Sequence, residues 1–358
     1  MFDLRWENPT RWDAPIKRKI RVIDYISNIV LAKHSDGRIF CTNAINLQTM
    51  DRDGGNVVEL WTTHSPSIYS GFTVHQALIL PSGTMLLRIT KWDGHGYILR
   101  SNGTDYTTFT PVLSTWNGEM LFRSWSCNED GIVLAGEYTT ADVNKSVALL
   151  KATNDGQNWS SLRVFGGRTG TIPEIFHIHC VQYDSNSGLW WISCGDTDAE
   201  SKIYSSDGTT LTLIGSGTQY WRAVSFAFDE NYVYWGTDGT ISGFAHQMRW
   251  DKRDNTLLTG IAVPDYIYVT QKLEGFDSPL FLSDGHTRFV SNTIHLSNNG
   301  MDWYEGFRWI ANPDAVPYPA FNGLVDNEDG RVYAFTTSLL RHDTGEEFNN
   351  GTVILDIT

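Results

Sequence analysis

Short runs of alternating apolar and polar residues recur along the whole chain, and they predict many β-strands joined by tight turns. One stretch shows the pattern clearly, with strand-like runs at 174–183, 189–194, 202–205 and 210–215. Each run is too short for a typical helix, and turn-forming residues such as Asn186-Ser187-Gly188 separate them. We therefore expect four antiparallel strands in this stretch, which we name A to D in chain order.

The turn between strands A and B recurs seven times, roughly 50 residues apart, which is the spacing of a repeat architecture. Its marker residues are Gly37, Gly83, Gly131, Gly188, Glu230, Ser278 and Gly330. Seven equal units of four strands predict an all-β fold, a single seven-bladed β-propeller over residues 1–358. Two β-sandwiches are the structural alternative, but they do not require equal spacing.

The last unit supplies three strands, at 320–325, 331–336 and 352–357, before the sequence stops. We expect Phe2–Glu7 to supply the fourth, so that residues 1–10 complete the last blade, and we expect the first strand A at 24–32. Pairing of the N-terminal and C-terminal strands would close the ring and remove open sheet edges, which promote aggregation.

A second repeated feature is a hairpin of the form Ser/Thr-x-Asp/Asn-Gly-x-x-aromatic. It is clearest at Thr153–Trp159 and Ser297–Trp303, with weaker copies at Ser101–Tyr106 and Ser205–Leu211. The Asp or Asn side chain can accept backbone N–H groups, glycine supplies a positive φ, and the aromatic ring packs beneath the turn. This hairpin resembles the Asp box of the sialidase-like, BNR-repeat propellers. The resemblance implies a propeller and a bias toward carbohydrates.

Composition narrows the classes of partner. The formal charge of −14 and the lack of a Lys/Arg run argue against nucleic acid. No apolar stretch approaches the ~18 residues of a membrane span, and the N-terminus lacks a signal-peptide pattern. We therefore expect a soluble protein made in the cytosol. The four cysteines lack CxxC spacing, which argues against zinc, and they are expected as buried residues; a disulfide between Cys180 and Cys194 stays open.

Polar side chains recur at the level where strand A begins, a level at which a core strand normally carries Val, Ile or Ala. They are His75, Arg123, His177, His179, Arg222, Gln271 and Asn322. We interpret them as donors around one ligand in the channel mouth; the alternative is that each is tied to neighbouring backbone or water. Trp116 and Trp221 lie in the links between blades, where they either stack on a sugar ring or pack blades together.

The loops between strands B and C are acidic and are expected at the same end of the blades. Most of these carboxylates are solvated loop charges, although some lie where they can act as general acids or bases. Asp196, Asp198 and Glu200 alternate in one loop and are the candidate ligands for calcium, although the full EF-hand pattern is missing. We otherwise expect neither a metal nor another cofactor.

Three functions remain open. A classical sialidase is disfavoured, because the resemblance implies three arginines, and Arg123 and Arg222 have no convincing third. A polysaccharide lyase or glycoside hydrolase would use those arginines to bind a carboxylate, with His177, His179 or His75 as base. A glycan-binding module, or a structural part of a larger assembly such as a phage virion, needs no catalysis. We favour glycan recognition over catalysis.

Overall fold

The protein is almost entirely β-structure. The structure, a computed structural model, describes residues 18, 20–64, 67–91, 95–115, 124–139, 145–167, 174–264, 266–273, 276, 279–287, 291–311, 320–327, 331–337, 339–341, 347–348 and 351–357. Its helices, within this part of the chain, are two single 3₁₀ turns, η1 (Ser67–Tyr69) and η2 (Gln219–Trp221). None of the described helices has the length and apolar character that a membrane crossing needs.

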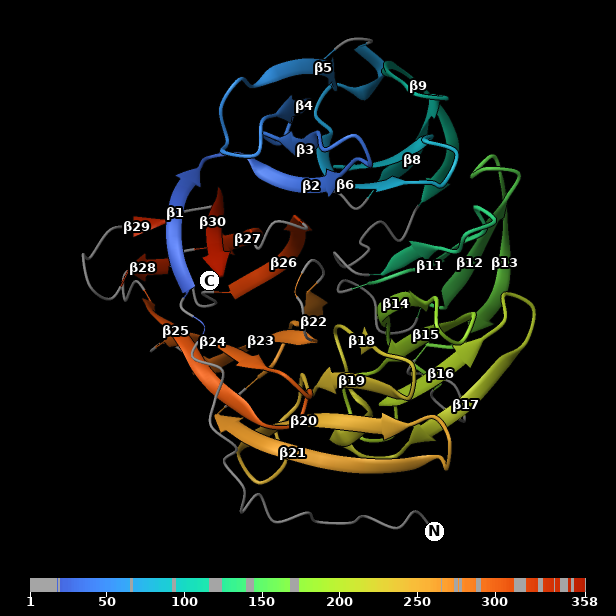
Figure 1. Ribbon diagram of the computed structural model, residues 1–358. Coiled ribbons are helices and arrows are strands. Elements are labelled where there is room, and N and C mark those ends of the chain that lie inside the picture. Colours follow the sequence, from blue (N-terminus) through green and yellow to red (C-terminus); the bar gives the residue numbers. More distant parts are fainter. Residues whose placement is uncertain are drawn as a thin grey trace. The chain divides into compact units, whose positions relative to one another are not determined.

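The strands of the described residues form seven antiparallel sheets, six of four strands and one of six, which is the architecture of a seven-bladed β-propeller (Figure 1). The predicted fold class is therefore confirmed. The chain divides into two compact units, a first unit of Asn28–Gly217 and a second unit of Met1–Ser27 with Thr218–Thr358.

The first unit contains four sheets in chain order, each built from four consecutive strands. The first sheet contains β2 (Ile29–Lys33), β3 (Ile39–Thr42), β4 (Asn46–Met50) and β5 (Val58–Thr62), and the second contains β6 (Thr73–Ile79), β7 (Met85–Thr90), β8 (Gly96–Asn102) and β9 (Asp105–Thr115). The third sheet contains β10 (Trp125–Cys127), β11 (Val133–Gly136), β12 (Val147–Thr153) and β13 (Asn158–Phe165). The fourth sheet contains β14 (Ile178–Asp184), β15 (Leu189–Cys194), β16 (Lys202–Ser206) and β17 (Leu211–Ser216).

The second unit contains the fifth, sixth and seventh sheets. The fifth sheet contains β18 (Ala227–Phe228), β19 (Tyr232–Gly236), β20 (Phe244–Asp251) and β21 (Thr256–Pro264). The sixth contains β22 (Thr270–Leu273), β23 (Leu280–Thr287), β24 (Ser291–Ser297) and β25 (Trp303–Ala311), and it is extended by β28 (Leu339–Arg341) and β29 (Glu347–Phe348). The seventh contains β26 (Ala320–Asn327), β27 (Arg331–Thr337), β30 (Gly351–Ile357) and β1 (Ile20–Ile26). The extension was not expected, and it covers the edge of β25.

The seventh sheet is closed by a strand from the other end of the sequence. β1 pairs antiparallel with β30, from Ile20 opposite Ile357 to Ile26 opposite Thr352. The expected closing segment, Phe2–Glu7, lies outside the described residues, and β1 holds the fourth position of the sheet. The strand expected at 24–32 is wrong, because a bend at Ser27 and Asn28 divides it between β1 and β2.

The fourth sheet matches its expected strands within a few residues. The glycines that mark the first four A–B turns, Gly37, Gly83, Gly131 and Gly188, all have positive φ angles. This left-handed conformation costs glycine little and other residues more, so the glycines set where each hairpin reverses. A periodic turn signal was therefore enough to predict strand position.

The apolar core consists of clusters between consecutive sheets. In one of them Leu134 and Phe165 of the third sheet pack with Ile178 and Trp190 of the fourth. Burial of each such side chain stabilises the fold by roughly 1.5–3 kcal/mol. Other clusters join the first and second sheets, the second and third, and the sixth and seventh.

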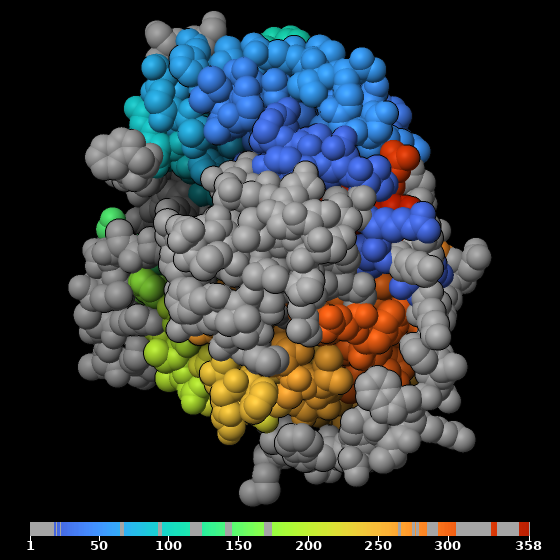
Figure 2. Space-filling model, turned by 90° about the vertical axis from the view of Figure 1, so that its left-hand side faces the viewer, coloured from blue at the N-terminus to red at the C-terminus, as the bar shows by residue number. Residues whose placement is uncertain are grey.

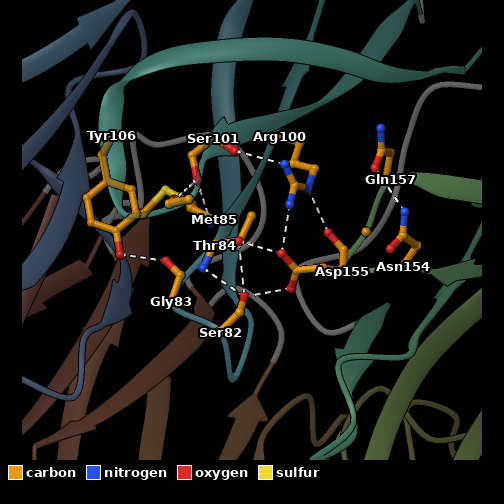
Figure 3. Close-up of polar contacts among 12 residues, drawn as sticks. Ser82, Gly83, Thr84, Met85, Arg100, Ser101, Tyr106, Asn154, Asp155 and Gln157 are labelled. Atoms are coloured by element: carbon orange, nitrogen blue, oxygen red, sulfur yellow. Dashed lines mark hydrogen bonds and ion pairs between the residues drawn. The ribbon is translucent and has the colours of Figure 1, made fainter.

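A polar link supplements the apolar packing between the second and third sheets (Figure 3). Asp155, in the turn between β12 and β13, accepts hydrogen bonds from Ser82 and Thr84 at 2.6 Å each. Arg100 of β8 binds the same carboxylate at 2.7 Å and also donates to the Asp155 carbonyl oxygen. One hairpin turn is thus bound to the neighbouring sheet through its side chain and its backbone.

Figure 2 shows residues of the first sheet in blue. The exposed apolar side chains in or beside β4 and β5 include Ile45, Val57 and Val58. A few exposed apolar residues of this kind are normal in soluble domains and mark no site by themselves.

None of the four cysteines is in a disulfide. Cys41, Cys180 and Cys194 are buried, and Cys127 is half-buried. Cys180 and Cys194, on the neighbouring strands β14 and β15, form no disulfide, so the alternative left open by the sequence does not hold.

Candidate functional site

Several first strands carry a β-bulge at the level where the sequence places polar residues. The extra residue is His75 in β6, His179 in β14 and Asn322 in β26, since the residues on either side of each pair with consecutive partners. A bulge residue leaves the ladder, and its side chain is re-aimed. The polar residues at these positions therefore coincide with local departures from regular pairing.

The clearest cluster lies at the start of the fourth sheet and contains His177, His179 and Asp196. Nε2 of His177 lies 3.2 Å from Oδ1 of Asp196, and Nε2 of His179 lies 3.6 Å from the same oxygen. Both histidine side chains are only 2% exposed, whereas the Asp196 side chain is 27% exposed. The carboxylate is therefore the part of this cluster that solvent reaches most easily.

The loop after β15 fixes the position of Asp196. It begins at Gly195, whose positive φ and close approach to the backbone of Glu200 leave no room for a side chain. The buried Glu200 carboxylate accepts hydrogen bonds from the Thr197 amide and hydroxyl, and Ser201 donates to the Thr197 carbonyl. These internal bonds make the loop a compact turn that holds Asp196 beside β14.

The third sheet supplies the other side of the cluster. Nδ1 of His177 lies 3.1 Å from the carbonyl oxygen of Thr139, and the Tyr138 ring stacks on the His177 ring at 4.0 Å. Ile178 also donates its backbone N–H to the carbonyl of Glu137. This close approach requires Gly136, where a Cβ atom would lie 2.3 Å from the Ile178 side chain.

A second polar group lies in the second unit, around Arg222. Its Nη2 forms an ion pair with Oδ2 of Asp238 at 2.8 Å, and the Asp238 amide donates to the Arg222 carbonyl. Burial first, then the charges of Asp238 and Asp284, raise the pKa of the Tyr268 phenol. The Tyr268 ring lies parallel to that of Tyr266, with centroids 6.0 Å apart. Arg222 therefore already has a carboxylate partner.

The other predicted site residues are placed as follows. His75 bonds with the hydroxyl of Thr73 at 2.6 Å. His75 is exposed as a residue, but protein surrounds much of its ring. Desolvation of the ring, and then the charge of Arg88, lower the pKa of the imidazole to about 4.

Trp221 is 4% exposed and packs against other tryptophans, which is the core-packing alternative for this residue.

Gln271 is half-buried in β22, and Asn322 lies in β26 of the same unit. The structure gives each of them a strand position in the second unit. Arg123 and Trp116 lie outside the described residues. Of the residues predicted to form one ring of donors, His75, His177 and His179 lie in the first unit and Arg222, Gln271 and Asn322 in the second.

The three carboxylates of the loop proposed for calcium do not share one set of partners in the structure. Asp198 is exposed and Glu200 is bound to Thr197, whereas Asp196 points at the two histidines. Among the described residues, the group of three metal-ligating side chains whose ligand atoms lie within 4.8 Å of one another is His177, His179 and Asp196.

Tyr138, Thr139 and Asp238 were not predicted from the sequence as neighbours of the site. A signal for them exists, because each follows a glycine that ends strand B, at Gly136 in β11 and Gly236 in β19. A Cβ atom on Gly236 would lie 2.0 Å from Ile267, as one on Gly136 would meet Ile178. The repeated glycine thus marks where the next sheet comes closest.

No protein-family model matches the sequence, and no curated protein sequence matches it. Among solved structures, the chain is similar to the GH74 xyloglucanase from Xanthomonas campestris, with a TM-score of 0.61 and 12% identity over 90% of this chain and 53% of that one. Prolyl oligopeptidase B from Galerina marginata gives 0.56 and 9% identity, covering 92% of this chain and 51% of the other.

The Sqt1 protein of Saccharomyces cerevisiae gives a TM-score of 0.51 and 12% identity, over 92% of this chain and 87% of that one. This chain spans about half the length of the xyloglucanase that it matches. At such identities the likeness shows the fold, and the protein is a β-propeller on that ground as well as on its sheet order.

Proposed function

We propose that this protein is a carbohydrate-recognising β-propeller that binds sugar beside Asp196 at the start of the fourth sheet. The observation that carries the proposal is the convergence of two buried imidazoles on one oxygen of a partly exposed carboxylate, 3.2 Å and 3.6 Å away. Buried groups held by neighbouring backbone are already ordered before a ligand arrives, so binding costs little further conformational entropy.

The chemistry of the cluster suits sugar hydroxyls. The Asp196 carboxylate accepts hydrogen bonds, and an exposed oxygen on it can bind one or two hydroxyl groups of a sugar. Tyr138 is half-buried beside His177 and adds an aromatic wall of the kind that packs on the apolar face of a sugar ring. Polar groups beside an aromatic side chain are a common arrangement in small-ligand sites.

Two further observations support a carbohydrate as the ligand. The structural likeness to a xyloglucanase extends over 90% of the chain, although it is a likeness of fold. In the hairpin at Thr153–Trp159, Nε1 of Trp159 donates to the carbonyl of Gly156 at 2.8 Å, which is consistent with an aromatic ring packed against its own turn. The relationship to sialidase-like propellers belongs to the same proposal.

A binding assay on two matched variants tests it. Xyloglucan and a uronate-containing polysaccharide are used as ligands in affinity electrophoresis and calorimetry. We expect D196N to weaken binding by about tenfold or more, since a charge-assisted hydrogen bond is worth about 1.5–3 kcal/mol. D198N removes an exposed carboxylate from the same loop and should bind as the wild type does. Equal binding by D196N and the wild type to both polysaccharides would reject this site.

Catalysis on a polysaccharide is the second candidate, and the partly exposed Asp196 carboxylate beside the two imidazoles favours it. A carboxylate beside a bound polysaccharide can act as a general acid or base. Incubation with the same polysaccharides separates the candidates: ultraviolet-absorbing unsaturated products indicate a lyase, and new reducing ends without them indicate a hydrolase. Binding without product supports recognition alone. Neither binding nor product would leave a structural role in a larger assembly, such as a virion.

A further inference from the structure

The hydrogen bonds of the His177 ring require a proton or a cation between this ring and Asp196. A carbonyl oxygen only accepts hydrogen bonds, so Nδ1 of His177, 3.1 Å from the Thr139 carbonyl, carries the proton. In the neutral ring Nε2 then presents a lone pair, and it faces Oδ1 of Asp196 at 3.2 Å. Two acceptors at this distance repel each other unless a proton or a cation lies between them.

A second nitrogen, Nε2 of His179, faces the same oxygen at 3.6 Å. The two imidazoles and the carboxylate therefore bring three ligand atoms together, from β14, from the residue before it and from the loop that follows β15. All three atoms lie within 4.8 Å of one another. One cation between them would satisfy all three ligand atoms together, whereas a single proton bridges one pair.

We propose that His177, His179 and Asp196 bind a divalent transition-metal ion of the zinc class. Zinc lies about 2.0–2.1 Å from histidine nitrogen and about 2.0–2.2 Å from carboxylate oxygen in tetrahedral sites. Two ligand atoms at those distances and a tetrahedral angle are about 3.3–3.4 Å apart. The separations of 3.2 Å and 3.6 Å in this cluster bracket that value.

The donor set distinguishes this ion from calcium. Calcium takes six to eight oxygen ligands, whereas imidazole nitrogen suits zinc and its neighbours in the first transition row. The loop that suggested calcium contributes Asp196 alone to the cluster, since the Glu200 carboxylate is bound to Thr197. Three protein ligands would leave a tetrahedral ion one open position, as catalytic zinc sites have.

The surroundings hold the ligands as a metal site requires. A metal-binding histidine commonly donates its second ring N–H to a carbonyl, which fixes the ring and its tautomer, and Thr139 provides that carbonyl for His177. Tyr138 stacks on one face of the same ring, and Phe176 packs at 4.5 Å from it. The His177 ring is thus oriented by contacts that do not involve its Nε2 atom.

Direct metal binding tests the inference. The full chain is stripped with a chelator, dialysed, and titrated with ZnCl₂ in a calorimeter and with CoCl₂ in a visible spectrometer. We expect one ion per chain and the strong visible absorption of tetrahedral cobalt. H179Q and D196N each remove one ligand and should weaken binding by more than about 100-fold, the upper end of the cost of losing an outer partner.

Matched controls keep the result interpretable. D198N removes a carboxylate two residues away and should bind zinc like the wild type. D196N changes a partly exposed side chain without changing its size, so it tests the site even if H179Q fails to fold. The inference is overturned if the wild type takes up no zinc or cobalt, which leaves a shared proton as the bridge, or if D198N loses as much affinity as D196N.

The inference goes beyond carbohydrate recognition and does not depend on it. Its readout is the binding of the metal alone, so a chain that binds no polysaccharide still gives a clear result. Conversely, polysaccharide binding that persists in the chelated protein would support the proposed function without a metal.

Discussion

Nη2 of Arg100 lies 2.7 Å from Oδ2 of Asp155, and this ion pair joins β8 of the second sheet to the β12–β13 turn of the third (Figure 3). Ser82 and Thr84 donate to the same carboxylate from the turn between β6 and β7. Beneath it, Leu86 of the second sheet lies within 3 Å of where a Cβ on Gly156 would be. The turn is therefore held against its neighbour by both polar and close apolar contacts.

Replacement of Asp155 by alanine should destabilise the first unit by roughly 1–3 kcal/mol. The variant removes three hydrogen bonds to one carboxylate, each worth about 1 kcal/mol, and leaves Arg100 without this charged partner. The side chains of both partners are half-buried, so solvent screens the ion pair in part. Urea unfolding followed by tryptophan fluorescence measures the change.

Asp207 provides the matched control, because it holds the corresponding position of the β16–β17 turn. Its carboxylate is exposed and accepts hydrogen bonds from Thr209 and Thr210 of its own turn. D207A should therefore cost less than D155A. If both variants unfold at the same urea concentration, the link between the sheets contributes nothing beyond the local turn.

The same carboxylate predicts a dependence on pH. Burial, the largest single influence, raises the pKa of Asp155, but the hydrogen bonds from Ser82, Thr84 and Arg100 together lower it below the usual value. A lowered pKa in the folded state contributes stability above the unfolded value of about 3.9, and that stability is lost as the pH falls further. The difference in unfolding free energy between wild type and D155N should thus shrink between about pH 5 and pH 3. A constant difference over that range would contradict this cause.

The sheet order could be predicted from the sequence because local signals repeat. Glycines with positive φ at Gly83, Gly131 and Gly188 set the turns, and alternating apolar residues set the strands between them. The boundary between β1 and β2 was missed because Ser27-Asn28 is a weak turn signal within a long apolar run. The partner of β1 is β30, more than 300 residues away, and no local pattern specifies such a pairing.

The candidate site could be predicted only in part. Counting along strand A located His75, His177 and His179, because the repeat fixes their level in the blade. Which partners they meet depends on side-chain direction at a bulge and on contacts between sheets, as the meeting of Tyr138 with His177 shows. Asp196 was noted as a loop carboxylate, but its contact with both histidines follows from the compact turn of its loop.

Gly136→Ala should destabilise the protein and disturb the candidate site together. A Cβ atom at this position would lie 2.3 Å from Cγ2 of Ile178, a contact that real Cβ atoms do not make. Relief requires the third and fourth sheets to separate, at a cost of about 1–3 kcal/mol for an overpacked core. Thermal unfolding measures the stability, and the proton resonances of the imidazole rings of His177 and His179 report the displacement.

Gly166 is the control for this substitution, because no atom lies within 4 Å of a Cβ built on it. Gly166→Ala should leave the unfolding temperature and the histidine resonances close to those of the wild type. A Gly136→Ala protein as stable as the Gly166→Ala protein would mean that the glycine after β11 is not needed for the approach of β14.

The buried cysteines should be unreactive in the folded protein. Burial, which outweighs a hydrogen bond from Asn28, raises the pKa of the Cys41 thiol to about 11, and burial likewise raises the pKa of Cys127 to about 11. Because the thiolate is the reactive form, alkylation at pH 8 should be slow for both. Ellman's reagent should detect four thiols in urea without a reductant, since Cys180 and Cys194 form no disulfide. Cys127 is the least buried of the four, so it should react first, and C127S should remove that first phase of the reaction. Rapid reaction of all four thiols in the native state would contradict the prediction, because it would show that the sheets open far more readily than their packing implies.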